Sequence, residues 1–158
     1  MDRFSGAELL VQILFGLWFA TLVVGFAVDL DQRLLPDELT LPIIPLALVL
    51  DVSGRNPFVG AGDLVPAILI AIVVPVVIYL ASIPFGAGAF GLGDVKLLVG
   101  VGLMSGFVRA VSGLLAGLFA AGFVLTLLLV TRRIGRRSFV PFGPFLIFGA
   151  LWGVFVRF

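Results

Sequence analysis

Two aspartates stand at the edges of apolar segments, where a charge is costly and therefore needs a reason. Asp29 follows an apolar run of about residues 8–28, and Asp94 opens another run of about 94–107, directly after Gly-Leu-Gly. At one depth on different helices, two such carboxylates can share a water molecule. The ionised carboxylate takes a proton from the water, which attacks a carbonyl carbon, while the protonated carboxyl donates to the carbonyl oxygen. This is the chemistry of an aspartic protease.

The composition removes most other routes to hydrolysis. The chain has no histidine and no cysteine, which excludes a Ser–His or Cys–His nucleophile, an HExxH zinc helix and a thiolate zinc site. Ser105, in the stretch GLMSGF, faintly resembles the turn of a membrane serine protease but has no histidine to act as its base. We therefore expect neither a metal nor a cofactor. The net charge of +1 gives no indication of a nucleic-acid partner.

Six apolar runs separate the polar stretches and predict the fold. The 158 residues are 61% hydrophobic and 12% charged, and the mean hydropathy is +1.29, which is more apolar surface than a soluble domain of this length can bury. The runs cover about residues 8–28, 38–51, 64–84, 94–107, 110–131 and 144–156. Since a bilayer helix needs about 20 apolar residues, we predict an all-α integral membrane protein. Residues 1–158 would form one domain, a compact bundle of about six transmembrane helices.

The basic residues predict how this bundle is oriented. With six spans, the first, third and fifth loops share one side of the membrane, and the stretch 132–137 on that side holds four arginines. By the positive-inside rule these loops are cytoplasmic and both termini are outside. Asp29 and Asp94 then lie at the cytoplasmic face at similar depth. The basic residues are Arg33, Lys96, Arg132, Arg133, Arg136 and Arg137 on the cytoplasmic side, and Arg3, Arg55, Arg109 and Arg157 on the other.

The neighbours of the two aspartates have functional and purely structural interpretations. Gly91 and Gly93 lack a Cβ, so a substrate backbone could approach Asp94 closely, although Gly-Leu-Gly-Asp is also typical of a flexible loop with a helix cap. Asp37 follows Pro36 and precedes an apolar run, so it is most simply a helix N-cap.

Other charged residues are expected to serve structure or topology. Arg33 lies four residues after Asp29 and can pair with it if the first helix continues that far. Lys96 is expected to extend toward the lipid headgroups. Asp51 and Asp63 border the opposite loop, and we expect both to be solvated.

Three stretches resemble the signatures of a known family in order and spacing. They are DLDQRLLPDELTLP (29–42), GLGDVKLL (91–98) and PFGPFLIFGA (141–150). The chain resembles the type IV prepilin peptidases, the GxGD aspartic proteases of bacterial membranes, over about residues 20–152. The resemblance implies that Asp29 and Asp94 are the catalytic pair, with Asp31 as the rival for the first role. The third motif begins with Pro141, Phe142, Gly143 and Pro144, for which we predict only a rigid turn into the last helix.

The resemblance also implies a function. Members cut the short basic leader from prepilin-like proteins, after the final glycine of the leader, so the expected partners are such substrates and membrane lipids; the oligomeric state stays open. Many bacterial members carry an additional N-terminal portion with paired cysteines, associated with methylation. This chain has no cysteine, and its first apolar run begins at about residue 8. We therefore expect peptidase activity without methyltransferase activity. The leading alternative is an ion- or proton-coupled carrier, because intramembrane carboxylates also mark transport paths. A scaffold subunit of a pilus or secretion machine is the third.

Overall fold

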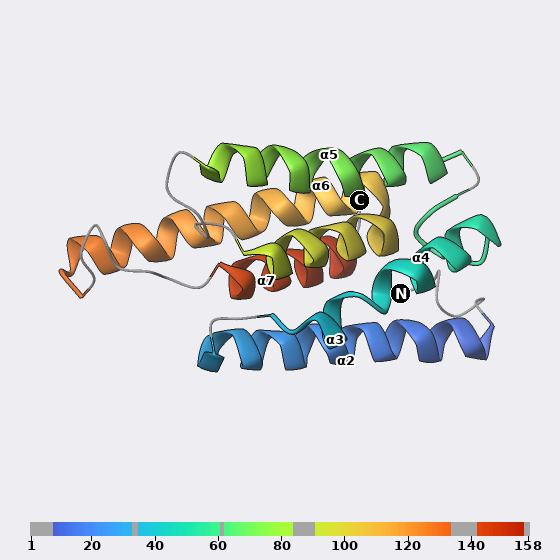
Figure 1. Cartoon of the computed structure of the whole chain (residues 1–158), viewed down its shortest axis with the longest axis horizontal. Helices are drawn as coiled ribbons and strands as arrows, with labels where there is room; N and C mark the ends of the chain where they lie inside the picture. The colour runs from blue at the N-terminus through green and yellow to red at the C-terminus, as the bar shows by residue number, and fades with distance from the viewer. Residues whose placement is uncertain (1–7, 33–34, 61, 84–90, 134–141, 157–158) are drawn as a thin grey trace.

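The computed structural model is all-helical, and its helices follow the apolar runs of the sequence (Figure 1). The structure describes residues 8–32, 35–60, 62–83, 91–133 and 142–156. Arg33 and Pro141, both singled out above, lie outside these residues. The described helices are α2 (Leu9–Gln32), α3 (Asp37–Thr40), α4 (Ile43–Val52), α5 (Leu64–Ser82), α6 (Leu92–Val130) and α7 (Gly143–Phe155). Within this part of the chain, α2, α5 and α6 are long and apolar enough to cross a membrane, and α7 is a shorter apolar helix.

Helix α6 is a hairpin of two helical arms. Its 39 residues would extend about 58 Å as a straight rod, about twice the thickness of a bilayer core. The helix breaks at Gly106, whose φ of 74° and ψ of 173° are rarely adopted by residues with a side chain. The two arms therefore run in opposite directions (Figure 1) and correspond to the predicted runs 94–107 and 110–131.

The break between these arms falls at Gly106, three residues before Arg109, which stands between the predicted runs 94–107 and 110–131. Arg109 lies inside the second arm, with its guanidinium carbon 4.7 Å from the centre of the Phe58 ring. A guanidinium over an aromatic face keeps a favourable electrostatic partner in apolar surroundings. The charge is therefore accommodated within a helix, while Gly106 supplies the conformation that the turn requires.

The second apolar run forms two helices, α3 and α4, instead of one. Pro42 stands between them, and proline has no N–H with which to continue a helical hydrogen-bond ladder. The N–H of Leu41 donates to the carbonyl oxygen of Asp37 at 2.9 Å and closes α3. The 10 residues of α4 span only about 15 Å, which is short for a bilayer core of about 30 Å.

Helices α6 and α7 share the most extensive contact among the described helices, and glycines form the part of it that involves the second arm of α6. Gly113 and Gly117 face Gly149 and Gly153, and a Cβ at any of the four would collide with backbone atoms of the opposite helix. Small residues four positions apart let two helices approach closely where no hydrophobic effect drives them together. This interface therefore fixes the position of α7 against α6.

Apolar side chains occupy both the inside and the outside of the bundle. Phe15 and Trp18 of α2, Met104 of α6 and Ile147 of α7 are almost completely buried in the core. Large apolar side chains, including Phe119 on the second arm of α6, are exposed over most of the outer surface. A soluble monomer rarely exposes continuous apolar surface of this extent, so the outer face indicates contact with lipid.

Candidate active site

Three helix ends meet at one end of the bundle. Helix α2 ends three residues after Asp29, α6 begins two residues before Asp94, and α7 begins at Gly143. A Cβ added to Gly143 would lie 2.5 Å from Oδ2 of Asp29 and 3.2 Å from Oδ1 of Asp94. Because both distances start at the same point, the two oxygens are at most about 5.7 Å apart, roughly two O–H···O hydrogen bonds. One water molecule can therefore bridge the two carboxylates.

Asp29 is buried although it carries a carboxyl group, with only 4% of the residue exposed. The backbone N–H of Gly143 faces this carboxyl group, while Oδ2 has no hydrogen-bond partner among the described residues. A buried polar atom without a partner is destabilising and rare in native proteins. A buried carboxylate oxygen without a partner, beside a second carboxylate, therefore indicates a reactive site and not a stabilising contact.

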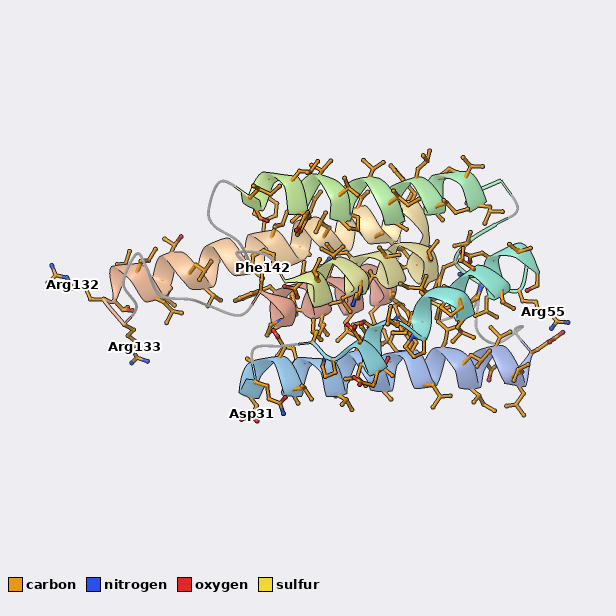
Figure 2. All side chains as sticks on the ribbon, viewed as in Figure 1. Asp31, Arg55, Arg132, Arg133 and Phe142 are labelled. Atoms are coloured by element: carbon orange, nitrogen blue, oxygen red, sulfur yellow. The ribbon has the colours of Figure 1, made fainter. Side chains whose placement is uncertain are left out.

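Asp31, the rival for the first catalytic role, lies on another side of α2. Its side chain is exposed and points away from the bundle (Figure 2). Two residues along a helix turn the side chain by about 200°, because one turn takes 3.6 residues. The structure therefore brings Asp29, and not Asp31, beside Asp94.

Asp94 is half-buried in the first turn of α6, and its surroundings give the two neighbouring glycines different roles. Gly91 is the extended N-cap of α6, is exposed, and turns its backbone N–H toward the Asp94 carboxylate. Gly93 faces inward, where an added Cβ would lie 2.8 Å from Cβ of Leu35 and 2.9 Å from its carbonyl oxygen. The space expected for a substrate backbone at Gly93 is therefore filled by Leu35, whereas Gly91 stays accessible.

Lys96 and Asp37 form an ion pair, with Nζ 2.6 Å from Oδ1. Lys96 was expected to extend toward lipid headgroups, and it contacts Asp37 instead. The expectation that Asp37 caps α3 is wrong, because the N-cap residue is Pro36 and Asp37 is the first helical residue, without a capping hydrogen bond. The two charged residues are 59 positions apart, and the spacing of charges along one chain does not reveal such a contact.

Gly143 is the site residue whose role the sequence analysis missed. The third motif was expected to form only a rigid turn, yet Gly143 lies against both carboxylates, where a side chain would collide with Asp29. Phe142 precedes it as the N-cap of α7, and Pro144 follows it inside the first turn. The sequence offered little signal for this role, because glycine is also a common residue at the start of a helix.

Asp51 and Asn56 form a polar cluster at the opposite end of the bundle, where one expectation from the sequence is wrong. Asp51 was expected to be solvated but is only 6% exposed, whereas Asp63 is exposed as predicted. The side-chain amide of Asn56 donates to Oδ1 of Asp51 at 2.6 Å and to the carbonyl oxygen of Met104 at 3.2 Å. Since Met104 lies just before the break at Gly106, Asn56 satisfies a carbonyl that the broken helix leaves open. The contacts of this cluster are those of a structural clamp on the turn of α6.

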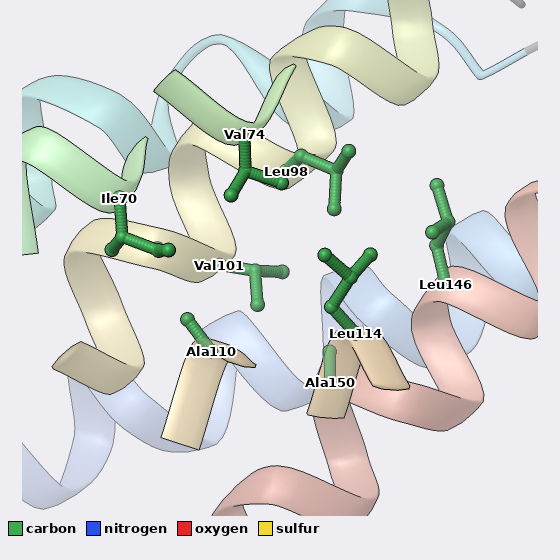
Figure 3. Close-up of a pocket in the computed structure, with 9 residues that line it drawn as sticks. Ile70, Val74, Leu98, Val101, Ala110, Leu114, Leu146 and Ala150 are labelled. Atoms are coloured by element: carbon green, nitrogen blue, oxygen red, sulfur yellow. The ribbon is translucent and has the colours of Figure 1, made fainter. Parts of the chain in front are cut away.

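The pocket in Figure 3 lies between α5, both arms of α6 and α7, and its lining holds no side chain that could act in catalysis. None of its lining residues is titratable or nucleophilic; they are Ile70, Val74, Leu98, Val101, Gly102, Ala110, Leu114, Leu146 and Ala150. Ser105 lies elsewhere in the core and donates its hydroxyl to the carbonyl oxygen of Val101. In the described part of the chain, no three acidic, histidine or cysteine residues come together to hold a metal ion. Among the described residues, the Asp29–Asp94 pair is therefore the candidate for carrying a reaction.

Comparison with known proteins finds relatives over most of the chain. The chain is 33% identical over 131 residues to a prepilin leader peptidase/N-methyltransferase of Aeromonas hydrophila, which covers 80% of this chain and 44% of the relative. The protein of the same name from Pectobacterium carotovorum subsp. carotovorum is 31% identical over 164 residues, covering 99% of this chain and 58% of the relative. The chain thus spans about half the length of these curated relatives. No solved structure matches it significantly. Residues 14–130, which include Asp29 and Asp94, match the family model, and the chain belongs to the type IV leader peptidase family.

Proposed function

We propose that the chain is an aspartic endopeptidase of the cytoplasmic membrane that removes the short basic leader of prepilin-like proteins. The observation that carries this proposal is the approach of Asp29 and Asp94 to Gly143, with two carboxylate oxygens within reach of one water molecule. The family and the names of the relatives support the substrate class. The burial of Asp29, whose Oδ2 has no hydrogen-bond partner among the described residues, supports the assignment of the reaction to this pair.

We further propose that six segments cross the membrane: α2, α4, α5, both arms of α6, and α7. The catalytic end then faces the cytoplasm. Arg132 and Arg133 extend from the end of α6 on the same side as Asp31, while Arg55 lies at the opposite end (Figure 2). This distribution supports the orientation that the positive-inside rule predicts. A leader that enters from the cytoplasm then meets the aspartates at the membrane surface.

The first chemical step uses a water molecule held between Asp29 and Asp94. The ionised carboxylate accepts one proton from the water, whose oxygen forms a bond to the carbonyl carbon of the scissile peptide. The other carboxyl, which is protonated, donates its proton to the carbonyl oxygen. The product is a neutral geminal diol on the substrate, and the two aspartates have exchanged protonation states.

The second step breaks the peptide bond and restores the enzyme. The carboxyl that received the water proton donates it to the amide nitrogen, and the electron pair of the C–N bond leaves with that nitrogen. The other carboxylate takes a proton from one diol hydroxyl, which becomes the carbonyl oxygen of the new carboxyl group. Each aspartate ends in the protonation state in which it began.

Co-expression with a candidate prepilin tests the proposal, with cleavage read by gel shift and N-terminal sequencing. Asp29→Asn and Asp94→Asn should each abolish cleavage, because residues that act as one unit lose almost all activity when either is changed. Asp31→Asn should keep substantial activity, and the exposed Asp63 at the far end supplies the control Asp63→Asn. A chain that cleaves nothing but conducts ions in liposomes would favour the carrier, and full function of both Asn variants would favour a scaffold.

Methyl transfer is the second activity in the names of the relatives. The expectation of a peptidase without methyl transfer stays a prediction. Purified chain, prepilin and S-adenosylmethionine are incubated together, and the mass of the mature product is measured. A product that carries one additional methyl mass would contradict the expectation.

A further inference from the structure

The segment between α2 and α4 is anchored to the first turn of α6 by a charged contact. We call residues 35–40 the strap. Asp37, in this strap, binds Lys96 of α6 at 2.6 Å, and the two side chains are 55% and 29% exposed. The other ion pair in the described residues joins Arg55 to Glu8 at 3.9 Å, with both side chains more than half exposed. The contact between Asp37 and Lys96 is therefore the shorter and the more shielded of the two.

A second contact anchors the strap between the helices that carry the aspartates. Leu35 lies against Gly93, the residue before Asp94, where an added Cβ would lie 2.8 Å from Cβ of Leu35. On its other side, Cδ2 of Leu35 lies 3.2 Å from the position that a Cβ would take at Gly25. Gly25 is one helical turn before Asp29 in α2. The strap therefore lies between the two catalytic helix ends.

The helices α2 and α6 depend on intermediaries for their relative position. Direct contacts between them are few in the described residues, whereas α3 and α7 each contact both. Helix α7 supplies one bridge, through Gly143 against Asp29 and Asp94. The strap supplies the other, and Asp37 and Lys96 hold it against α6.

We propose that the Asp37–Lys96 ion pair is a latch that sets the distance between the two catalytic aspartates. Asp37 and Lys96 are positioning residues, because their charges act on the reaction through the placement of Asp29 and Asp94. This positioning role goes beyond the proposed function. Its expected effect on cleavage rests on the proposed function. In this role the negative charge of Asp37 is engaged by Lys96 and is not free to attract a basic leader.

Kinetics separate a latch from a leader-binding role. A displacement of about 1 Å in a catalytic group costs about 100-fold in rate, so Lys96→Met and Asp37→Asn should each lower kcat by ten- to a hundredfold and leave KM within about twofold. The double variant should be no worse than either single one, because the two residues share one interaction. The swap of Asp37→Lys with Lys96→Asp should recover part of kcat. Arg55→Met, which removes the exposed ion pair at the other end, is the matched control and should change neither constant.

A distance measurement tests the latch without relying on cleavage. The chain has no cysteine, so spin labels at Val23→Cys on α2 and Leu92→Cys on α6, both exposed positions, report only the separation of these helices. Lys96→Met should broaden or shift the measured distance distribution, and the charge swap should restore it. An unchanged distribution in Lys96→Met, or a change in KM alone, would overturn the latch. If the chain cleaves no prepilin, the proposed function fails while the distance distribution still decides this inference.

Discussion

Gly143→Ala is the substitution that tests the site geometry most directly. The added Cβ would stand 2.5 Å from Oδ2 of Asp29, 2.9 Å from its Cγ and 3.2 Å from Oδ1 of Asp94. Non-bonded heavy atoms pack comfortably at about 3.5 Å, so the Asp29 carboxylate or the start of α7 must move by about 1 Å. A misplacement of that size costs about 100-fold in rate. We therefore expect kcat/KM to fall about 100-fold, equivalent to about 2.7 kcal/mol of transition-state stabilisation.

The assay compares cleavage of a detergent-solubilised prepilin by purified Gly143→Ala and by a matched glycine variant. Gly122 lies in the second arm of α6, and an added Cβ there would meet nothing within 4 Å. Gly122→Ala should therefore cleave at the normal rate, and alanine also favours helix by up to about 1 kcal/mol over glycine. Thermal unfolding in detergent checks that both variants are folded. A folded Gly143→Ala chain with normal kcat/KM would refute the convergence of the two aspartates on this glycine.

Three further predictions concern the glycine interface, the effect of metal removal and the charge of Glu38. Gly149→Ala should lower stability by about 1–3 kcal/mol, seen as a lower melting temperature in detergent, because its Cβ would collide with the backbone of Gly113; an unchanged melting temperature would contradict the close glycine interface. EDTA should leave cleavage intact, since two carboxylates suffice for the chemistry. A loss of cleavage that an added divalent ion restores would contradict the metal-free mechanism. Glu38→Gln should raise KM for a basic leader more at low salt than at high salt, because Glu38 is exposed, has no ion pair among the described residues and acts through a screened charge. An effect independent of salt would favour a structural role for Glu38.

The sequence predicted the helical class and the placement of the apolar segments well. Asp29 lies in the last turn of α2, α5 begins at the predicted residue 64, and α7 begins one residue before its predicted start. The resemblance to a family of leader peptidases is confirmed over residues 14–130. These features depend on local composition, because about 20 apolar residues in a row are enough to indicate a membrane helix.

The long-range contacts were not predictable in the same way. Asp37 and Lys96 are far apart in sequence, and each has a plausible local role that hides their pairing. The burial of Asp51 depends on Asn56 and on the turn of α6, so it cannot be seen in the residues beside Asp51. The predicted runs 94–107 and 110–131 placed the break beside Arg109 instead of at Gly106, because a charge in an apolar run is conspicuous and one of many glycines is not. A long-range contact decided the first two of these cases, and the conformational freedom of one glycine decided the third.

The glycine interface between α6 and α7 links the stability of the bundle to its chemistry. Gly143 lies six residues before Gly149, about 9 Å along the axis of α7, so the contact of Gly149 with Gly113 sets how far the start of α7 reaches between the aspartates. A bulkier residue at Gly149 must push α7 away from α6 and carry Gly143 with it. Substitution there should therefore lower stability and activity together, whereas substitution at Gly143 should lower activity and leave the distant interface intact. The placement of two catalytic carboxylates thus depends on backbone contacts more than a helical turn away from them.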